Sequence, residues 1–382
     1  TGASAGFVEE KATSAYAMLN GDTTMWNMGL KYNAGLRFVK TDQTVGGFQS
    51  NTDPRNATLT NGGLYPNNNA FVYLKTSYNE TLPSATAALN LSKDVVLRMS
   101  ASRTMTRADP NALRPGLNFS DPSAATGTVG NPDLKPYLSD NIDLGLEWYT
   151  GGSGYVSATP FFKHIKGFTT NANITAPFNA LAPYGITFGA LSPTQQQAIN
   201  ARGGPDQANV VLTEQINAQG YLTVKGLELS WVQPLDRVLP WQGFGFSTNY
   251  TRIHQSTNGG VSGAVALGVP ENAYNFVAYY EDRGLMFRLA QTYNQGSQIA
   301  TANQNGITNA ALYQNSYTQL DFSSAYEIGE IMGYTSRYWP TITFDVINLN
   351  KAKQRQYFQF SNATFTEYAP GMTTMLGLRL KF

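Results

Sequence analysis

The sequence lacks cysteine and is poor in charge. None of its 382 residues is a cysteine, which excludes disulfide frameworks, thiolate metal sites and cysteine nucleophiles. Its 26 basic and 25 acidic side chains make up 13% of the chain, about half the share that is usual in soluble domains. The net charge of +1, without a run of lysine and arginine, gives no electrostatic footprint for nucleic acid. We therefore expect no nucleic-acid partner.

Long apolar runs are also missing. No stretch of 18 apolar residues occurs in the chain, so the sequence encodes no transmembrane helix. The longest charge-free segment, 167–201, is interrupted by Pro177, Pro183 and Pro193. What the chain has instead is 36 glycines, 22 tyrosines and 20 phenylalanines. This composition predicts a turn-rich, aromatic, all-β protein.

Apolar and polar residues alternate along many segments. In 141–149, the apolar residues Ile142, Leu144, Leu146 and Trp148 alternate with mostly polar ones. The same period of two recurs in 95–102, 285–289, 341–346 and 376–382. An antiparallel β-barrel crosses a bilayer with such strands, one face toward lipid and one toward the lumen. A soluble β-sandwich produces the same alternation in any one strand. The lengths of the connections between strands therefore have to distinguish a barrel from a sandwich.

The connections between the expected strands alternate in length. Thirteen strands are predicted, at 7–19, 27–48, 70–91, 94–106, 138–150, 154–169, 220–233, 242–254, 272–281, 285–296, 315–327, 338–349 and 372–382. The short connections are 20–26, 92–93, 151–153, 234–241, 282–284 and 328–337. The long ones are 49–69, 107–137, 170–219, 255–271, 297–314 and 350–371. Short periplasmic turns and long extracellular loops are typical of outer-membrane barrels.

The tryptophans give an independent indication of sidedness. Trp26, Trp241 and Trp339 begin strands that leave a short turn, and Trp148 and Trp231 end strands that enter one. All five are thus expected at the same rim. Indole rings favour the membrane–water interface, so this pattern indicates an aromatic girdle; the alternative is chance clustering at one end of a soluble sandwich.

One helix is expected in the long connection 170–219. Ser192 is suited to the N-cap, Pro193 to the first turn, and Gly203 to the position after the last helical residue. We expect a small element on a loop rather than a second domain.

An odd number of antiparallel strands cannot close by itself. Single-chain bacterial barrels have even strand numbers, and Thr1 is neither an initiator methionine nor part of a signal peptide. Residues 1–382 are therefore expected to be the C-terminal portion of a longer chain.

At this point the sequence resembles the TonB-dependent outer-membrane receptors along nearly its whole length. The most specific part is VGNPDLKPYLSDNIDLGLEWY at 129–149, which resembles the family's Asn-Pro-Asp-Leu-Lys-Pro segment leading into a barrel strand. Further similar segments follow in the family's order, at 82–107, 161–168, 224–231, 274–294 and 344–350. The ending LGLRLKF is similar to a barrel-assembly signal, with Leu376, Leu378, Leu380 and Phe382 as its apolar positions.

The resemblance implies a transmembrane antiparallel barrel of 22 strands around a plug, of which this chain would supply the last thirteen. The plug and the TonB box are absent from the chain. The implied function is active uptake of a large, scarce solute across the Gram-negative outer membrane, without a cofactor. The implied partners are TonB–ExbB–ExbD through the missing plug, the barrel assembly machinery, membrane lipid and the solute.

Charged residues on the polar side of the strands are expected to face the lumen and the plug. They are Arg98, Asp143, Glu147, Glu228, Arg288, Asp321, Asp345 and Arg379. Holding water and forming salt bridges is their expected role. Asp143 and Glu147 lie about 13 Å apart along a strand, too far for a glycosidase pair. His164 and His254 have no metal-ligand or catalytic-triad spacing around them, so neither an enzyme nor a metal site is predicted.

Aromatic residues in the expected loops are candidates for solute contact. They are Phe119, Tyr137, Phe178, Tyr184, Phe188, Tyr313 and Tyr317, among Asn, Gln and Ser. Aromatic faces beside amides suit neutral sugars, whereas an anionic ferric chelate would favour clustered Arg and Lys. We therefore expect an oligosaccharide, with a ferric siderophore or cobalamin receptor and a passive porin or adhesin as alternatives. The aromatics could instead only pack the loops together.

Overall fold

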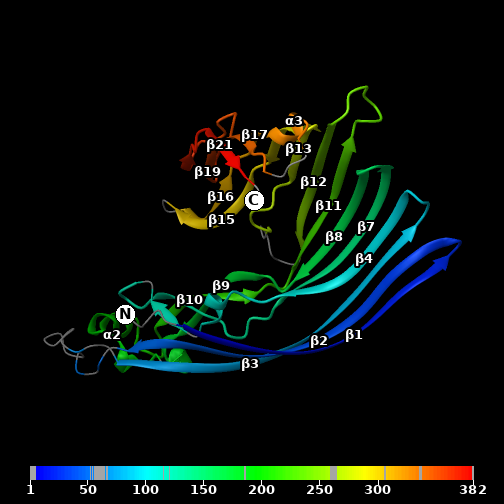
Figure 1. The fold of residues 1–382 in the computed structure, drawn as a ribbon. Coiled ribbons are helices and arrows are strands. Elements are labelled where there is room, and N and C mark those ends of the chain that lie inside the picture. The colour runs from blue at the N-terminus through cyan, green and yellow to red at the C-terminus, as the bar shows by residue number, and fades with distance from the viewer. Residues whose placement is uncertain are drawn as a thin grey trace.

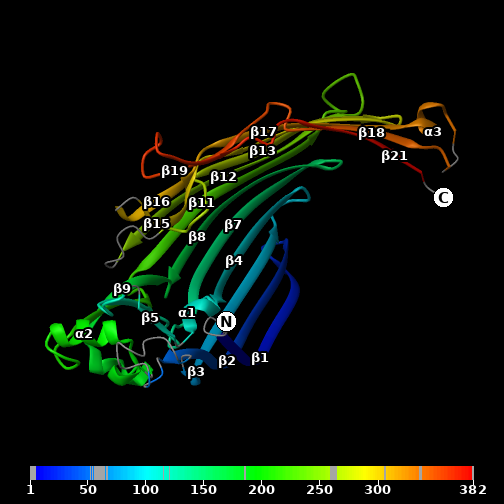
Figure 2. The ribbon, with the colours of Figure 1, turned by 90° about the vertical axis from the view of Figure 1, so that its left-hand side faces the viewer.

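The computed structural model describes residues 6–51, 53, 55, 65, 68–114, 116–119, 121–184, 186–258, 265–304, 307–334 and 338–380. Thirteen strands form one antiparallel sheet in which each pairs with the next along the chain. They are β1 (Gly6–Met25), β2 (Met28–Asn51), β3 (Asn68–Asn90), β4 (Val95–Thr106), β7 (Tyr137–Gly151), β8 (Gly154–Lys166), β11 (Tyr221–Pro234), β12 (Phe244–Asn258), β13 (Asn272–Asp282), β14 (Leu285–Asn294), β17 (Tyr317–Glu327), β18 (Thr341–Ile347) and β21 (Thr373–Arg379). The sheet is a curved wall that runs from blue β1 to red β21 (Figure 1, Figure 2).

This sheet confirms the predicted fold and the alternation of short and long connections. The largest boundary error concerns 20–26, which was predicted as a turn: β1 continues to Met25, and the chain reverses at Trp26 and Asn27. Both turn residues have positive φ, 52° and 62°, which matches the two-residue hairpin turns that suit twisted strands. The polar residues before them pair with β2 instead of forming a loop, for example Asn20 with Asn33.

The two faces of the sheet differ in chemistry. Because residues opposite each other in antiparallel strands point to the same side, the register of β7 with β8 aligns Ile142 with Phe162. Ile142, Leu144, Leu146 and Trp148 are all exposed on this side, which we call the apolar face. The opposite side, the polar face, carries Asp143 and Glu147 of the same strand. In the part of the chain that the structure describes, no helix is long and apolar enough to cross a membrane.

All five tryptophans lie at the rim formed by the short turns. Trp26 is in the β1–β2 turn, Trp148 and Trp231 are near the ends of β7 and β11, and Trp241 and Trp339 lie in the connections before β12 and β18. Each side chain is exposed. The predicted girdle therefore has the required placement.

Two smaller sheets, which the sequence did not predict, fill the long connections. The first loop sheet contains β5 (Leu117–Phe119), β6 (Thr126–Val129), β10 (Asn209–Asn217) and β9 (Thr169–Pro177). The second loop sheet contains β15 (Ser297–Gln304), β16 (Ile307–Gln314), β19 (Gln354–Phe358) and β20 (Thr364–Tyr368). Each joins two separate connections, as in the parallel pairing of β6 with β10. Figure 1 places both on the side of the sheet away from the short turns.

Short helices complete the connections. The predicted loop helix is confirmed as α2 (Pro193–Ala201), where Ser192 and Gln195 form a reciprocal capping box and Gly203 has a φ of +98°. The others are α1 (Pro110–Leu113) and α3 (Ile328–Ile331), with 3₁₀ turns η2 (Phe178–Tyr184) and η3 (Phe188–Ala190).

Candidate functional site

The eight predicted lumen charges share the polar face. The register pairs Arg98 with Gly145, and Glu228 with both Thr159 and Thr251. Continuing across the sheet, Arg288 pairs with Ser323 and Ser323 with Asp345. Successive rows put the whole set on one side, namely Arg98, Asp143, Glu147, Glu228, Arg288, Asp321, Asp345 and Arg379.

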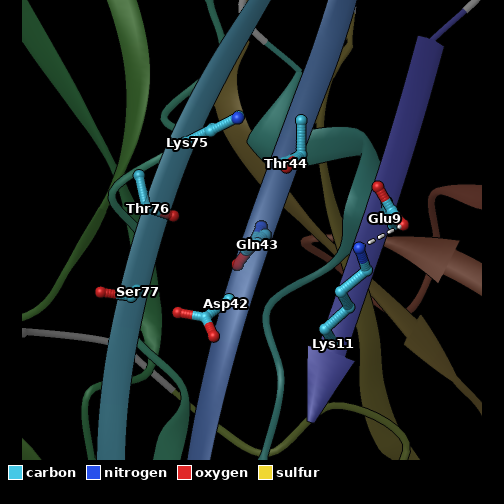
Figure 3. A pocket seen from close by; sticks show the side chains of 8 residues that line it. All are labelled: Glu9, Lys11, Asp42, Gln43, Thr44, Lys75, Thr76 and Ser77. Carbon is cyan, nitrogen blue, oxygen red and sulfur yellow. Dashed lines mark ion pairs between the residues drawn. The ribbon is translucent and has the colours of Figure 1, made fainter.

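Three of these charges meet in one hollow. The Arg98 Nε lies 2.8 Å from the Glu147 Oε1, and the Asp143 carboxylate accepts a hydrogen bond of 2.8 Å from the Ser100 hydroxyl. This hollow has a volume of about 540 Å³, and Lys31, Arg98, Asp143 and Glu147 contribute to its lining. Arg98 and Glu147 neutralise each other, and Asp143 accepts a hydrogen bond from Ser100. The arrangement suits water and ion pairs rather than catalysis. A separate hollow of about 400 Å³, whose lining includes Glu9, Lys11, Asp42 and Lys75, lies on β1–β3 (Figure 3).

The remaining charges are more dispersed. Asp321 accepts hydrogen bonds from the Asn348 backbone N–H at 2.7 Å and from the Gln319 amide at 2.8 Å, which fastens β17 to the connection after β18. Within the described part of the chain, no ion pair involves Glu228, Arg288, Asp345 or Arg379. In the same part of the chain no group of three His, Asp or Glu side chains converges.

The Asn-Pro-Asp-Leu-Lys-Pro segment, 131–136, anchors the first loop sheet to the wall. Leu134 is buried with Val45 of β2, Ala108 and Leu113. The Asn217 amide donates to the carbonyl oxygens of Lys135, at 2.9 Å, and Gly167, at 2.6 Å. A side chain with two such bonds holds two connections in one register. Segment 131–136 therefore has a structural role, since it fixes the first loop sheet to the long-connection edge of the thirteen-stranded sheet.

The loop aromatics separate into two groups. Phe178 has 0% exposure in the apolar core of the first loop sheet, with Phe119 and Phe188 at ring-centroid distances of 6.4 and 6.3 Å. These three pack the loops together, because burial leaves Phe178 no surface for a solute. Tyr184 belongs to η2, and its side chain lies outside the described set.

The other three aromatics lie nearer the sheet. The Tyr137 hydroxyl shares a hydrogen bond of 2.7 Å with Thr169. Tyr313 stacks on Tyr357 in the second loop sheet, with a centroid distance of 5.4 Å. Tyr317 stands at the start of β17 and lines a polar hollow. Among the predicted aromatics whose side chains the structure describes, Tyr317 is the one that lines this hollow, and its contact with a solute stays a prediction.

That hollow, which we call the amide groove, has a volume of about 330 Å³. It lies between β14, β17 and the second loop sheet, and none of its lining residues is charged. The lining residues are Gly268, Pro270, Asn294, Gln295, Ser297, Ile299, Gln314, Asn315, Tyr317 and Gln354. The sequence analysis noted Asn and Gln around the candidate aromatics but named no individual amide; the density of Asn and Gln at 294–298 and 314–319 was the available signal. The groove can offer many hydrogen bonds and one aromatic face.

Two carboxyl groups of the first loop sheet have perturbed acidities. Hydrogen bonds from Ser123 and Thr126, with the backbone N–H groups of Ala125 and Thr126, hold the pKa of the Asp121 carboxyl well below its usual range. Burial, together with the nearby Asp133, raises the pKa of the Glu214 carboxyl. These shifts describe local packing, because neither group lines the amide groove.

The last strand agrees in part with the predicted assembly signal. Leu376, Leu378 and Leu380 are exposed on the apolar face. Phe382 lies outside the described residues. The signal's recognition therefore stays a prediction.

The wall, the rim of indoles and the long polar loops define the class of an outer-membrane β-barrel. The family model "TonB dependent receptor-like, beta-barrel" matches residues 3–349. The chain belongs to this family, whose members reside in the Gram-negative outer membrane and are receptors rather than enzymes. This confirms the resemblance, the fold class and the location.

Similar solved structures include three receptors. The ferric yersiniabactin uptake receptor of Yersinia pestis has 19% identity and a TM-score of 0.59, over 99% of this chain and 46% of its own. A mutant ferric enterobactin receptor of Pseudomonas aeruginosa has 15% identity and a TM-score of 0.58, over 97% and 54%. The ferric-catecholate import receptor of E. coli K12 has 13% identity and a TM-score of 0.63, over 98% and 45%.

These likenesses concern the fold alone, since the identities are low. The chain spans about half the length of each of these structures. A search of curated proteins gave no match.

Proposed function

We propose that the intact protein is an active outer-membrane transporter whose solute is neutral and rich in hydroxyl groups, of the oligosaccharide class. The observation that carries this proposal is the amide groove. A sugar ring presents an apolar face to an aromatic side chain and hydroxyls to amides. An anionic ferric chelate would favour Arg and Lys, and the described lining of the groove contains neither.

We further propose that residues 1–382 form the C-terminal part of a 22-stranded barrel whose plug and early strands belong to the rest of the protein. Two observations support this: no pairing joins β1 to β21 among the described residues, and the similar structures are about twice as long. The plug would couple to TonB–ExbB–ExbD, and the barrel assembly machinery would read the C-terminal strand. The polar-face charges would hold water and pair with the plug.

The test is equilibrium binding by the full-length protein to a panel of neutral oligosaccharides, ferric siderophores and cobalamin. We expect an oligosaccharide to bind, and Gln354→Ala to weaken that binding by about threefold to tenfold, the cost of one hydrogen bond. Gln207→Ala, which removes an exposed amide outside the groove, is the matched control. Binding of a siderophore or cobalamin alone would overturn the solute class.

Uptake in cells with and without TonB tests the transport step. We expect uptake to require TonB, because the plug must be moved. Equal uptake in both strains would identify a passive porin instead, and surface binding without uptake would identify an adhesin.

A further inference from the structure

The long connection after β4 folds back over the polar face at the N-terminal end of the sheet. Two parts of it contact the wall, 107–114, which contains α1, and 131–134; together we call them the strap. The Asn131 backbone N–H donates to the Ala112 carbonyl oxygen at 2.8 Å, so the two parts form one unit. Figure 2 shows α1 beside the N-terminal end of β1.

Polar contacts hold the strap at both ends of one row of the sheet. The register places Glu10, Gln43 and Thr76 side by side on β1, β2 and β3. At one end, the Arg107 Nε lies 3.2 Å from the Glu10 Oε2. At the other, the Thr76 hydroxyl donates to the Pro132 carbonyl oxygen at 3.3 Å. The strap therefore passes over Gln43, the middle residue of the row.

Gln43 is buried there without a polar partner. It is 3% exposed, and within the described residues its Nε2 has no hydrogen bond. Thr41, in the next row of the same face, is 0% exposed, and its hydroxyl likewise has no partner among the described residues. Buried polar groups are nearly always hydrogen-bonded, and leaving one unpaired costs its full desolvation. The covered arrangement is thus less favourable for these two side chains than one in which water or a ligand meets them.

The strap is held to the wall by a small contact. Its buried apolar residues are Ala108, Leu113 and Leu134, which pack with Val45 of β2, whereas the core of the first loop sheet has eleven buried residues. Both side chains of the ion pair with Glu10 are partly exposed, and such pairs stabilise little. We therefore expect the strap to lift from the wall by local opening while the first loop sheet stays folded.

Lifting uncovers a defined set of groups. Tyr78 pairs with Thr41 across β2 and β3, so an amide, a hydroxyl and an aromatic ring share this part of the polar face. The amide groove presents the same combination. Lifting also takes Arg107 away from Glu10, so the charge left on the row is negative. An anionic chelate is disfavoured beside it, whereas a carboxylate accepts hydrogen bonds from hydroxyl groups.

We propose that Thr41, Gln43 and Tyr78 form a second site for the neutral, hydroxyl-rich solute, which the strap masks until it lifts. The identity of the solute rests on the proposed function. The amide and the hydroxyl hydrogen-bond to sugar hydroxyls, and the ring packs against the apolar face of a sugar. Because the closed strap competes with the solute, the apparent affinity falls in proportion to the fraction of molecules in which the strap is open.

The first test measures lifting without any solute. Gln43→Cys in the full-length protein is labelled with a water-soluble maleimide; residues 1–382 contain no cysteine, and the wild type gives any background from the rest of the protein. We expect labelling at least tenfold faster than that of Val210→Cys, which replaces a residue of 0% exposure in the core of the first loop sheet. Equal labelling rates would overturn the proposal, because the strap would then not lift.

The second test measures binding of the panel of neutral oligosaccharides to the full-length protein. Gln43→Leu should weaken binding about threefold to tenfold, the cost of one hydrogen bond. Arg107→Ala, which loosens the strap, should strengthen binding up to about threefold and speed the labelling of Gln43→Cys. Gln207→Leu, at an exposed amide outside both sites, is the control and should leave the affinity unchanged.

Unchanged affinity in Gln43→Leu, or weaker binding in Arg107→Ala, would overturn the masked site. If Gln354→Ala weakens oligosaccharide binding and Gln43→Leu does not, this inference alone fails. If the wild type binds no oligosaccharide, the proposed function fails as well.

Discussion

The two loop sheets are built by opposite means. The first encloses an apolar core around Phe178, and the hydrogen bond from the Asn217 amide to the Lys135 carbonyl ties it to segment 131–136. The second has aromatic side chains such as Phe365 and Tyr368 in exposed positions and borders the uncharged amide groove. A packed sheet has its side chains committed to each other, whereas an open one leaves them for a solute. Substitutions should therefore affect stability in the first sheet and affinity in the second.

The largest expected effect is on the core of the first sheet. Phe178→Ala leaves a cavity where the side chain is fully buried, and should destabilise this sheet by about 3–5 kcal/mol. Hydrogen exchange of 167–220 should accelerate while the thirteen-stranded wall keeps its protection. Phe365→Ala, at an exposed position of the second sheet, is the control. Unchanged exchange in Phe178→Ala would show that the first sheet is not a packed unit.

The next effect concerns the turn around Asp121. Asp121→Ala removes the acceptor for Ser123 and Thr126 and should cost about 1–3 kcal/mol locally at pH 7. Because folding lowers the pKa of Asp121, the wild-type carboxylate contributes its stability above the usual value of 3.8, and this contribution is lost as the pH falls further. Hydrogen exchange, corrected for intrinsic rates, should show that the local stabilities of the variant and the wild type converge as the pH falls. A difference in stability that stays constant down to pH 2 would contradict this prediction.

A smaller effect is expected at the amide groove. Tyr317→Ala removes its aromatic face and should weaken solute binding about tenfold, without changing the thermal stability of the wall. Tyr317→Phe keeps the ring and should retain most of the affinity. Titration calorimetry of the full-length protein measures both. Equal losses in the two variants would mean that the hydroxyl, and not the ring, makes the contact.

The smallest effect should come from Glu214. Burial and Asp133 disfavour its charged form, so ionisation above the usual pKa of 4.5 costs the first sheet stability as the pH rises. Glu214→Gln should remove this dependence and gain about 0.5 kcal/mol or less at pH 7. Hydrogen exchange of β10 at two pH values tests the sign. Weaker protection of β10 in Glu214→Gln than in the wild type at pH 7 would show that the charged carboxylate stabilises the sheet, contrary to this prediction.

The wall was predictable from sequence because its signal is local. In β7, alternation at Ile142, Leu144 and Leu146 identifies both the strand and its lipid face. The first turn was misplaced because Asn20 and Gly21 read locally as turn residues, although their partners on β2 keep them in the strand.

The rest depended on contacts that sequence does not display. Pairing of β6 with β10, or of β16 with β19, joins segments from different connections, and no periodicity marks such partners. Gln43 and Arg107 look unremarkable in sequence, and only the β1–β2 register and the ion pair with Glu10 bring them to one place. The candidate aromatics were chosen by type, so Phe178 and Tyr317 could not be distinguished before their burial was known.

The placement of the indoles has a practical consequence. Residues 1–382 contain 5 tryptophans, and all of them lie at the rim of short turns. The fluorescence of these five therefore originates from one side of the membrane only. In sealed vesicles, a water-soluble quencher confined to one compartment should dim either nearly all of the emission from these five tryptophans or almost none of it. The chain thus contains its own optical reporter of orientation, which needs no label.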